Sequence, residues 1–247
     1  MYRAIFISAL VAGSAFAQAA PPAFEAVSIK PNSSGVSGSD MNSTPGRLNA
    51  VNITPRSLLL YAFGIRESQL LGGPDWLDKE RFDLAAVTGT PIDLNRTTLP
   101  PYLQSMFADR FHLKFHRDTR ESPVYSLVVA KGGPKLTPHS GEALLGGTQP
   151  GTGVHSRAGK ASVNAKRTTM KRLAEVLGQQ TDRFVIDHTG LSGEYDFDLK
   201  WSTDLTADAE DPSIFTAIQE QLGLKLEPAK GPVEVIVIDS VERPSEN

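Results

Sequence analysis

The strongest constraint on the fold is that one succession of strand and helix signals occurs twice along the chain. In its first occurrence, alternating apolar residues at 47–53 predict a strand. Thr54 and Pro55 then supply the N-cap and the first position of a helix that Gly64 ends. The remaining signals of this half predict a strand at 81–84, a helix at 100–110 and strands at 111–115 and 124–129.

The second occurrence follows the same order. Thr168 is the expected cap of a helix over 169–177, which Gly178 closes. Asp211 and Pro212 begin a further helix that ends at Gly223, and its apolar side chains share one face. Those side chains are Ile214, Phe215, Ile218 and Leu222. The strand signals of this half lie at 162–164, 195–199, 224–226 and 232–238.

Matched positions of the two occurrences lie 109 to 115 residues apart, as Thr54 and Thr168 or Phe82 and Phe197 do. Small drifts of this kind are what loop insertions do to a duplicated sequence. Chance recurrence of common strand and helix patterns is the alternative. The sequence predicts an α+β fold with two similar β-α-β-β-α-β-β units, whose helices pack on mostly antiparallel sheets.

The first residues have the three parts of a secretory signal peptide: a positive Arg3, an apolar core at 4–11 and an Ala-Phe-Ala cleavage site at 15–17. The apolar core is too short to cross a bilayer, which takes about 20 residues. We therefore expect an exported protein, periplasmic or extracellular, with no stable membrane insertion after cleavage. The expected organisation is a signal peptide at 1–17, an N-terminal strand and mobile loop at 18–46, a first α+β unit at 47–130, a Gly/Pro-rich linker at 131–160 and a second α+β unit at 161–247.

Composition excludes several classes of function. The chain of 247 residues has no cysteine, which rules out disulfides, thiolate nucleophiles, Cys-ligated zinc and iron–sulfur clusters. Its net charge of -3 gives no general attraction to nucleic acid or anionic lipid. We expect no nucleic-acid partner.

The common catalytic templates fail on spacing. A phosphate-binding loop ending at Gly159-Lys160 would need glycine at Val154 and a hydroxyl at Ala161. A serine elbow at 190–194 has its second glycine one place early. Asp187 and His188 are adjacent in the sequence, so on a strand they would face opposite sides. We expect no catalytic site from these motifs.

Carboxylates and histidines give no metal or cofactor signal either. Asp196 and Asp198 share one strand face at a separation of about 6.6 Å, which overlaps that of glycosidase carboxylates, but a solvated face is the simpler interpretation. His112 and His116 would lie about 13 Å apart on a strand, too far to share an ion. His139 falls in the linker without metal-like spacing. We expect neither a metal nor a cofactor.

One charge feature points to a binding surface. Six cations follow one another without an acid between them, and two of them fall in the first turn of a helix, where the helix dipole disfavours positive charge. An anionic partner would explain this arrangement, and a solvated charge run is the alternative. The six residues are Arg157, Lys160, Lys166, Arg167, Lys171 and Arg172.

Several local strings are distinctive of one family. They are FEAVSIKPN at 24–32, GGPDWL at 72–77, DRF at 109–111, HRDTRESPVY at 116–125, DHTGLSG at 187–193 and VERP at 241–244. Over nearly the whole chain after residue 17, the sequence resembles the soil-associated exported proteins of unknown function that are abundant in acidobacteria. The resemblance implies a bacterial exported protein, and it carries no established activity or catalytic residues. More weakly, the β-α-β-β-α-β pattern is similar to the protein-binding periplasmic domains of secretins and TonB-dependent receptors.

Two functions remain open. The first is a non-enzymatic binding module of the cell envelope that holds an envelope or secreted protein, or a ligand, at its loops or at a sheet edge such as 233–238. The second is an exported hydrolase whose site is assembled between the two halves. Its candidate residues are Asp187, His188, Asp196 and Asp198.

Overall fold

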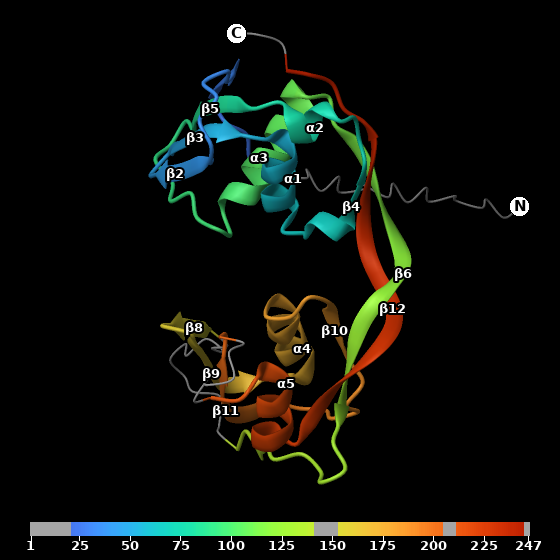
Figure 1. The fold of residues 1–247 in the computed structure, drawn as a ribbon. Helices are drawn as coiled ribbons and strands as arrows, with labels where there is room; N and C mark the ends of the chain where they lie inside the picture. Colours follow the sequence, from blue (N-terminus) through green and yellow to red (C-terminus); the bar gives the residue numbers. More distant parts are fainter. Residues whose placement is uncertain (1–20, 141–152, 205–210, 245–247) are drawn as a thin grey trace, which may run out of the picture. The chain divides into compact units, whose positions relative to one another are not determined.

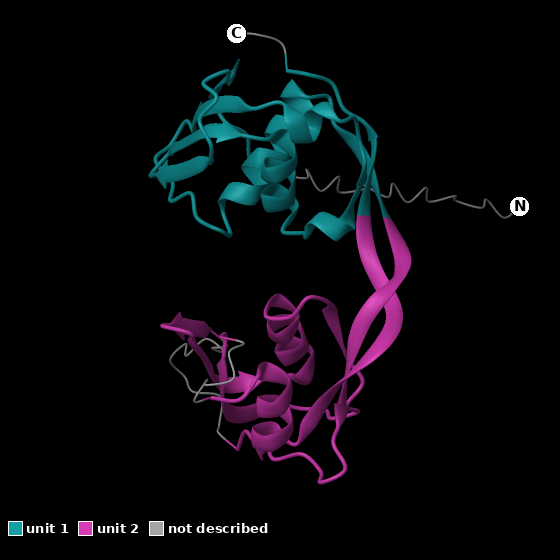
Figure 2. Cartoon of the chain, viewed as in Figure 1, with its two compact units in different colours: residues 1–117, 236–247 teal, residues 118–235 magenta. Residues whose placement is uncertain are grey.

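The computed structural model describes residues 21–140, 153–204 and 211–244 (Figure 1). The described chain has the expected mixed α+β fold with mostly antiparallel sheets. It divides into two compact units, unit 1 at 1–117 and 236–247 and unit 2 at 118–235 (Figure 2). The expected signal peptide lies outside the described residues.

Unit 1 is built on a four-stranded antiparallel sheet in the order β1-β5-β3-β2. Apolar residues on one face of β3, Leu48 and Ala50, are buried against the helices, where Leu59 and Phe107 join the same core. The strands are β1 (Ala26–Pro31), β2 (Asp40–Thr44), β3 (Arg47–Ile53), β4 (Leu70–Gly72) and β5 (Phe82–Val87). The helices are α1 (Pro55–Phe63), the 3-10 turn η1 (Glu67–Gln69), α2 (Trp76–Lys79) and α3 (Leu99–Arg110).

Unit 2 has a four-stranded antiparallel sheet in the order β7-β11-β9-β8. Val163, Leu199 and Trp201 are buried on one face of this sheet with Leu173 of α4. The strands are β7 (Thr137–Pro138), β8 (Val154–Arg157), β9 (Lys160–Thr168), β10 (Phe184–Asp187) and β11 (Tyr195–Ser202). The helices are α4 (Met170–Gln179), α5 (Ile214–Ala217) and the π turn η2 (Ile218–Leu222).

Two long strands, β6 (Lys114–Val129) and β12 (Leu224–Ser240), each begin in one unit and end in the other. They are neighbours in a third sheet, ordered β10-β6-β12-β4. The end of β12 pairs with β4 in unit 1, and the end of β6 pairs with β10 in unit 2. Each unit therefore contains a strand end that the other half of the sequence supplies.

The division into units differs from the expected one because of these strands. Pro123 and Pro232 were expected to begin separate strands, but each lies inside a long strand, which proline's extended φ permits. The stretch 131–160 is not only a linker, since its described part contributes β7 and β8 to the sheet of unit 2. The segment 233–238, expected as a free edge, belongs to β12, which lies between β6 and β4.

Helix ends differ from the expectation in three places. The helix expected to begin at Asp211 and Pro212 is α5, whose N-cap is Ser213, with its hydroxyl accepting from the Thr216 N–H. The N-cap of α4 is Thr169, whose hydroxyl accepts from the Arg172 N–H, and the helix continues through Gly178 to Gln179. Thr168 is instead the buried last residue of β9. Phe215 is 42% exposed, so it does not share the buried face of Ile214, Ile218 and Leu222. It follows Ile214 directly and therefore points about 100° around the helix from it.

Other expectations are confirmed. Thr54 caps α1 by accepting from the Ser57 N–H, Pro55 occupies the first helical position, and Gly64 ends the helix at φ 62°. The helix expected at 100–110 spans Leu99–Arg110.

Candidate functional site

A β-bulge at the end of β9 builds the most connected polar cluster of unit 2. Ala165 pairs with Phe197 and Thr168 with Tyr195, so β9 has one more residue than β11 between these pairs. The extra residue turns Arg167 to φ 51°, in the left-handed region that non-glycine residues seldom adopt. The bulge therefore fixes both the backbone N–H and the side chain of Arg167 in an unusual direction.

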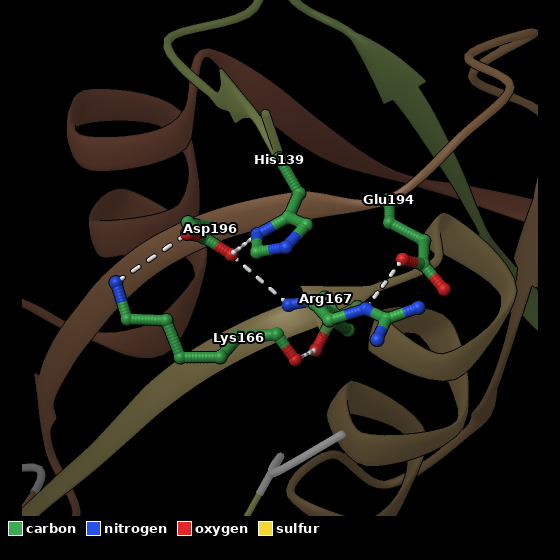
Figure 3. Close-up of polar contacts among 6 residues, drawn as sticks. His139, Lys166, Arg167, Glu194 and Asp196 are labelled. Carbon is green, nitrogen blue, oxygen red and sulfur yellow. Dashed lines mark hydrogen bonds and ion pairs between the residues drawn. The ribbon is translucent and has the colours of Figure 1, made fainter. Parts of the chain in front are cut away.

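Asp196 on β11 accepts a hydrogen bond from this backbone N–H (Figure 3). Its carboxylate accepts from the Arg167 N–H at 3.0 Å and from Nζ of Lys166 at 3.5 Å, and it lies 3.0 Å from Nδ1 of His139. The Arg167 hydrogen bond is the main cause that lowers the pKa of Asp196, and His139 and Lys166 add to it against partial burial. An ionised carboxylate only accepts, so Nδ1 of His139 carries the proton of this bond.

The Arg167 side chain turns to a second acid, since its Nε donates to Glu194 at 2.9 Å. The backbone N–H of His139 donates to the Glu194 carbonyl at 2.8 Å, which ties the end of β7 to the start of β11. We call His139, Arg167, Glu194 and Asp196 the bulge corner of unit 2. With its Nδ1–H bound by Asp196, a neutral His139 offers Nε2 as an acceptor in a fixed ring orientation.

Unit 1 has a bulge at the same place in its sheet. Ala50 on β3 pairs with Leu84 on β5, and Ile53 pairs with Phe82, so β3 has one more residue than β5 between these pairs. Asn52 there has φ 55°, and its N–H donates to Asp83 at 2.9 Å.

The residue that follows the edge strand β1 completes this cluster, as the residue that follows β7 does in unit 2. Asn32 donates from Nδ2 to the Asp83 carboxylate at 2.7 Å, and this bond, followed by that of Asn52, lowers the pKa of Asp83. The backbone N–H of Asn32 donates to the Arg81 carbonyl at 2.8 Å, and Nη1 of Arg81 donates to the Asn52 carbonyl at 2.8 Å. We call Asn32, Asn52, Arg81 and Asp83 the bulge corner of unit 1.

The two bulge corners correspond residue by residue. A proline precedes both Asn32 and His139, each helix cap follows two residues after the positive-φ residue, and the carboxylates occupy matching ladder positions. The ladder matches Phe82 with Tyr195, not with Phe197 as the sequence pattern indicated. At one position the charge is reversed, because Arg81 corresponds to Glu194.

The six expected cations lie at three places along unit 2. Arg157 and Lys160 face each other in the β8–β9 pair, Lys166 and Arg167 lie at the unit 2 bulge, and Lys171 and Arg172 begin α4. Four of them contact acids: Lys160 lies 3.9 Å from Asp211, Lys166 contacts Asp196, Arg167 contacts Glu194, and Arg172 lies 3.0 Å from Glu175. Four of the six cations of the expected anion-binding patch therefore have an acidic neighbour.

The four expected hydrolase residues are also separated, and all belong to unit 2. Asp187 accepts from the backbone and hydroxyl of Thr189 in its own turn, and Asp198 accepts from Asn164. His188 turns to Ser126 on β6, where its Nδ1 lies 2.6 Å from the hydroxyl oxygen. Asp196 alone enters the bulge corner.

Sequence reasoning missed His139, Glu194 and the whole corner of unit 1. The available signal was the Pro-Asn at 31–32 and the Pro-His at 138–139, each at the end of a strand. His112 and His116 each contact a different acid in unit 1: Nδ1 of His112 lies 3.1 Å from Glu242, and Nδ1 of His116 lies 2.8 Å from Asp239. Within 21–140, 153–204 and 211–244, no three His, Asp or Glu side chains converge as metal ligands.

No helix in the described part of the chain is long and apolar enough to cross a membrane. Comparison with curated proteins and with solved structures finds no match for the chain. Residues 56–241 match the family described as "Protein of unknown function (DUF3738)". This match takes in most of both units, the whole bulge corner of unit 2, and Arg81 and Asp83 of the bulge corner of unit 1, whereas Asn32 and Asn52 precede its start. The chain therefore belongs to the DUF3738 family of proteins of unknown function.

Proposed function

We propose that the protein is an exported, non-enzymatic binding module of a bacterial cell envelope, and that its bulge corners hold the partner. The observation that carries the proposal is the recurrence of the corner: in both units a carboxylate fixes a strained backbone N–H beside a side chain from the edge strand. Bulges of this kind re-aim side chains and occur next to functional sites. An envelope protein, a secreted protein or a ligand is the expected partner.

Internal duplication belongs to the same proposal. The matching sheet orders, β1-β5-β3-β2 and β7-β11-β9-β8, and the shared positions of both bulges support it. Two related surfaces on one chain raise overall affinity when a partner engages both. The charge reversal at Arg81 and Glu194 then gives each corner its own specificity.

Export and a soil-bacterial, acidobacterial origin complete the proposal. Residues 1–17 have the pattern of a cleaved signal peptide, which would place residues 18–247 in the periplasm or outside the cell. A chain of that length folds by burial of a core without disulfides, and both units have such a core.

Affinity purification tests this function. Residues 18–247 are immobilised and incubated with detergent-solubilised envelope of the native bacterium, and captured proteins are identified by mass spectrometry. Lys166→Ala removes an exposed cation beside the unit 2 corner, and Lys230→Ala removes an exposed cation from β12 as the matched control. We expect a reproducible partner whose capture falls with Lys166→Ala and not with Lys230→Ala. Equal capture by both variants would contradict a role for the corner.

A second function, an exported hydrolase, is favoured by one contact. The Ser126 hydroxyl lies 2.6 Å from Nδ1 of His188. In such a reaction Ser126 would form an ester with the substrate acyl group while His188 took its proton and passed it to the leaving group; water would then release the acid. Release of nitrophenol from p-nitrophenyl acetate by residues 18–247, lost in Ser126→Ala, would support it. Equal rates for both proteins would exclude this dyad.

A further inference from the structure

The bulge corner of unit 1 opens into a pocket of ≈ 570 Å³. Its lining includes the buried residues Asn52 and Phe82 and the side chains of Asn32, Ser33, Lys79 and Arg81. Pockets of about 300–1,000 Å³ are typical of small-molecule sites, and a lining this polar suits a polar ligand.

Hydrogen bonds of the Asn32 and Asn52 side chains hold the loop 32–38, which forms one wall of the pocket. Nδ2 of Asn52 donates to the carbonyls of Val36 and Gly38, at 2.7 and 2.5 Å. Oδ1 of Asn32 accepts from the N–H and the hydroxyl of Ser34, at 2.9 and 2.7 Å. Because buried Asn52 anchors this loop, the pocket exists before any ligand binds, and binding does not have to order the loop.

The acids around the opposite wall already face cations. Arg243 donates to both oxygens of Glu80, by Nε at 3.0 and 3.1 Å and by Nη2 at 2.6 Å, and these bonds lower the pKa of Glu80. Asp78 lies 2.9 Å from Arg56. Asp75 pairs with Lys79 at 2.6 Å, but the two side chains are 85% and 73% exposed. Exposed pairs of this kind contribute little, so a ligand anion can replace Asp75.

Arg81 differs from the other cations of this wall because its hydrogen bond goes to a neutral group, the Asn52 carbonyl. A guanidinium has five N–H donors and binds carboxylate or phosphate groups well. Unit 2 has Glu194 at this position, which would repel an anion. Within the described residues no acid forms an ion pair with the Arg81 guanidinium, so in unit 1 the pocket coincides with an arginine that keeps its charge for a ligand.

We propose that this pocket binds the anionic group of a small polar ligand, a carboxylate or a phosphate, between Arg81 and Lys79. The inference rests on the proposed binding function and names a ligand class for one of its two corners. The anchored loop 32–38 forms the facing wall. The ligand body fills the rest of the pocket and contacts Ser33 and Asn32.

An NMR titration of the isotope-labelled chain 18–247 tests the inference with three probes: inorganic phosphate, galacturonate and the neutral sugar galactose. We expect phosphate and galacturonate to shift the backbone amide signals of residues 33–36 and 81, and galactose to leave them in place. Comparison of the two active probes tells whether phosphate or a sugar carboxylate is the better ligand. Shifts with galactose equal to those with galacturonate, or no shift at 50 mM of either anion (a concentration set at about the weakest useful affinity), would overturn the proposal.

Three variants locate the site. Arg81→Glu places in the pocket the negative charge that Glu194 has in unit 2, and it should abolish the amide shifts caused by phosphate and galacturonate. Lys79→Gln alters an exposed side chain that the core does not need, and it should weaken binding about fivefold. Lys114→Gln, an exposed cation at the start of β6, is the control and should bind as the unaltered protein does. Binding that neither Arg81→Glu nor Lys79→Gln weakens would overturn the proposal, and Lys79→Gln remains decisive if Arg81→Glu unfolds the chain.

The titration contains no envelope protein, so its result is separate from that of the affinity purification. A partner captured through Lys166 with no anion bound at Arg81 would refute the pocket and leave the binding module. Anion binding without any captured protein would support the pocket and would mean that the module binds a small ligand, with no support for an envelope or secreted protein as its partner.

Discussion

Arg81 and Glu194 occupy the same position in the two units and carry opposite charges. The N–H of the residue after the first strand, Asn32 or His139, donates to the carbonyl of each at 2.8 Å. Each side chain also contacts the positive-φ residue of its bulge: Arg81 donates to the Asn52 carbonyl, and Glu194 accepts from the Arg167 side chain. The backbone of the corner is thus repeated while its electrostatics are inverted, as expected of two surfaces that share a scaffold and differ in what they hold.

The N-cap of α4 provides a first prediction. Thr169→Ala removes the acceptor of the Arg172 N–H and should lower the free energy of unfolding by about 1 kcal/mol. Thr54→Ala at α1 should cost about the same, since its hydroxyl accepts from the Ser57 N–H in the same way. Urea denaturation measures both. An unchanged free energy of unfolding in Thr169→Ala would contradict the cap that the structure shows.

Burial separates two apolar residues of the α5–η2 segment. Ile218 is fully buried, so Ile218→Ala should lower the free energy of unfolding by about 2–5 kcal/mol. Phe215→Ala should cost less, because its ring is 42% exposed and contacts the ring of Tyr125 at 5.4 Å. Thermal and urea unfolding of both variants measure the difference. Equal losses would mean that Phe215 belongs to the core.

Unfolding should depend on pH through Asp83. Hydrogen bonds from Asn32 and Asn52 lower its pKa below the ordinary value of 3.8, so the ionised form stabilises the folded state. This stability is complete above the unfolded pKa and is lost as the pH falls from about 5 through the lowered folded value. In urea denaturation between about pH 7 and 3, Asp83→Asn should be less stable at neutral pH and should lose less on acidification. An exposed-site control, Asp109→Asn on α3, should keep the slope of the unaltered protein. Parallel pH curves for Asp83→Asn and the unaltered protein would argue against this source of stability.

Separated halves of the chain should fail to fold fully. A fragment of 18–129 lacks Ile236–Ile238, the part of β12 that pairs with β4, and a fragment of 130–247 lacks Val124–Leu127, the part of β6 that pairs with β10. Amide hydrogen exchange should show weak protection of β4 and β10 in the isolated fragments and recovery when the two are mixed. Two monomeric fragments with full protection of these strands would contradict the exchange of strand ends.

The local signals of the sequence predicted most elements well, and the long-range pairing least. The strand at 47–53, the Thr54 cap and the Gly64 end appear as expected because each depends on a few neighbouring residues. The predicted lengths of β6 and β12 were wrong, because Pro123 and Pro232 each indicated the start of a strand. In the structure, pairing with neighbouring strands continues each strand through its proline. Strand partners far apart in sequence leave no periodic signal.

The candidate site was predicted only in fragments for the same reason. Asp196 was singled out as one of a pair of carboxylates, and Lys166 and Arg167 as part of a run of cations. Neither reason included His139, which lies 57 residues from Asp196. In unit 1, Asn32 and Asp83 are 51 residues apart, and amide and carboxylate pairs of this kind look like ordinary surface residues until the bulge brings them together. The bulge itself, one extra residue opposite an acid, has no signature in the alternation of apolar residues.

Site-specific photo-crosslinking in the native bacterium tests the central claim, that the bulge corners hold the partner, most directly. A photo-reactive residue replaces Lys79 or Lys166 beside the two corners, or Lys114 or Lys230 as controls in the same units. The account predicts covalent adducts of defined mass from Lys79 and Lys166 and none above background from Lys114 and Lys230. Adducts that form equally at all four positions, or only at the two control positions, would contradict it.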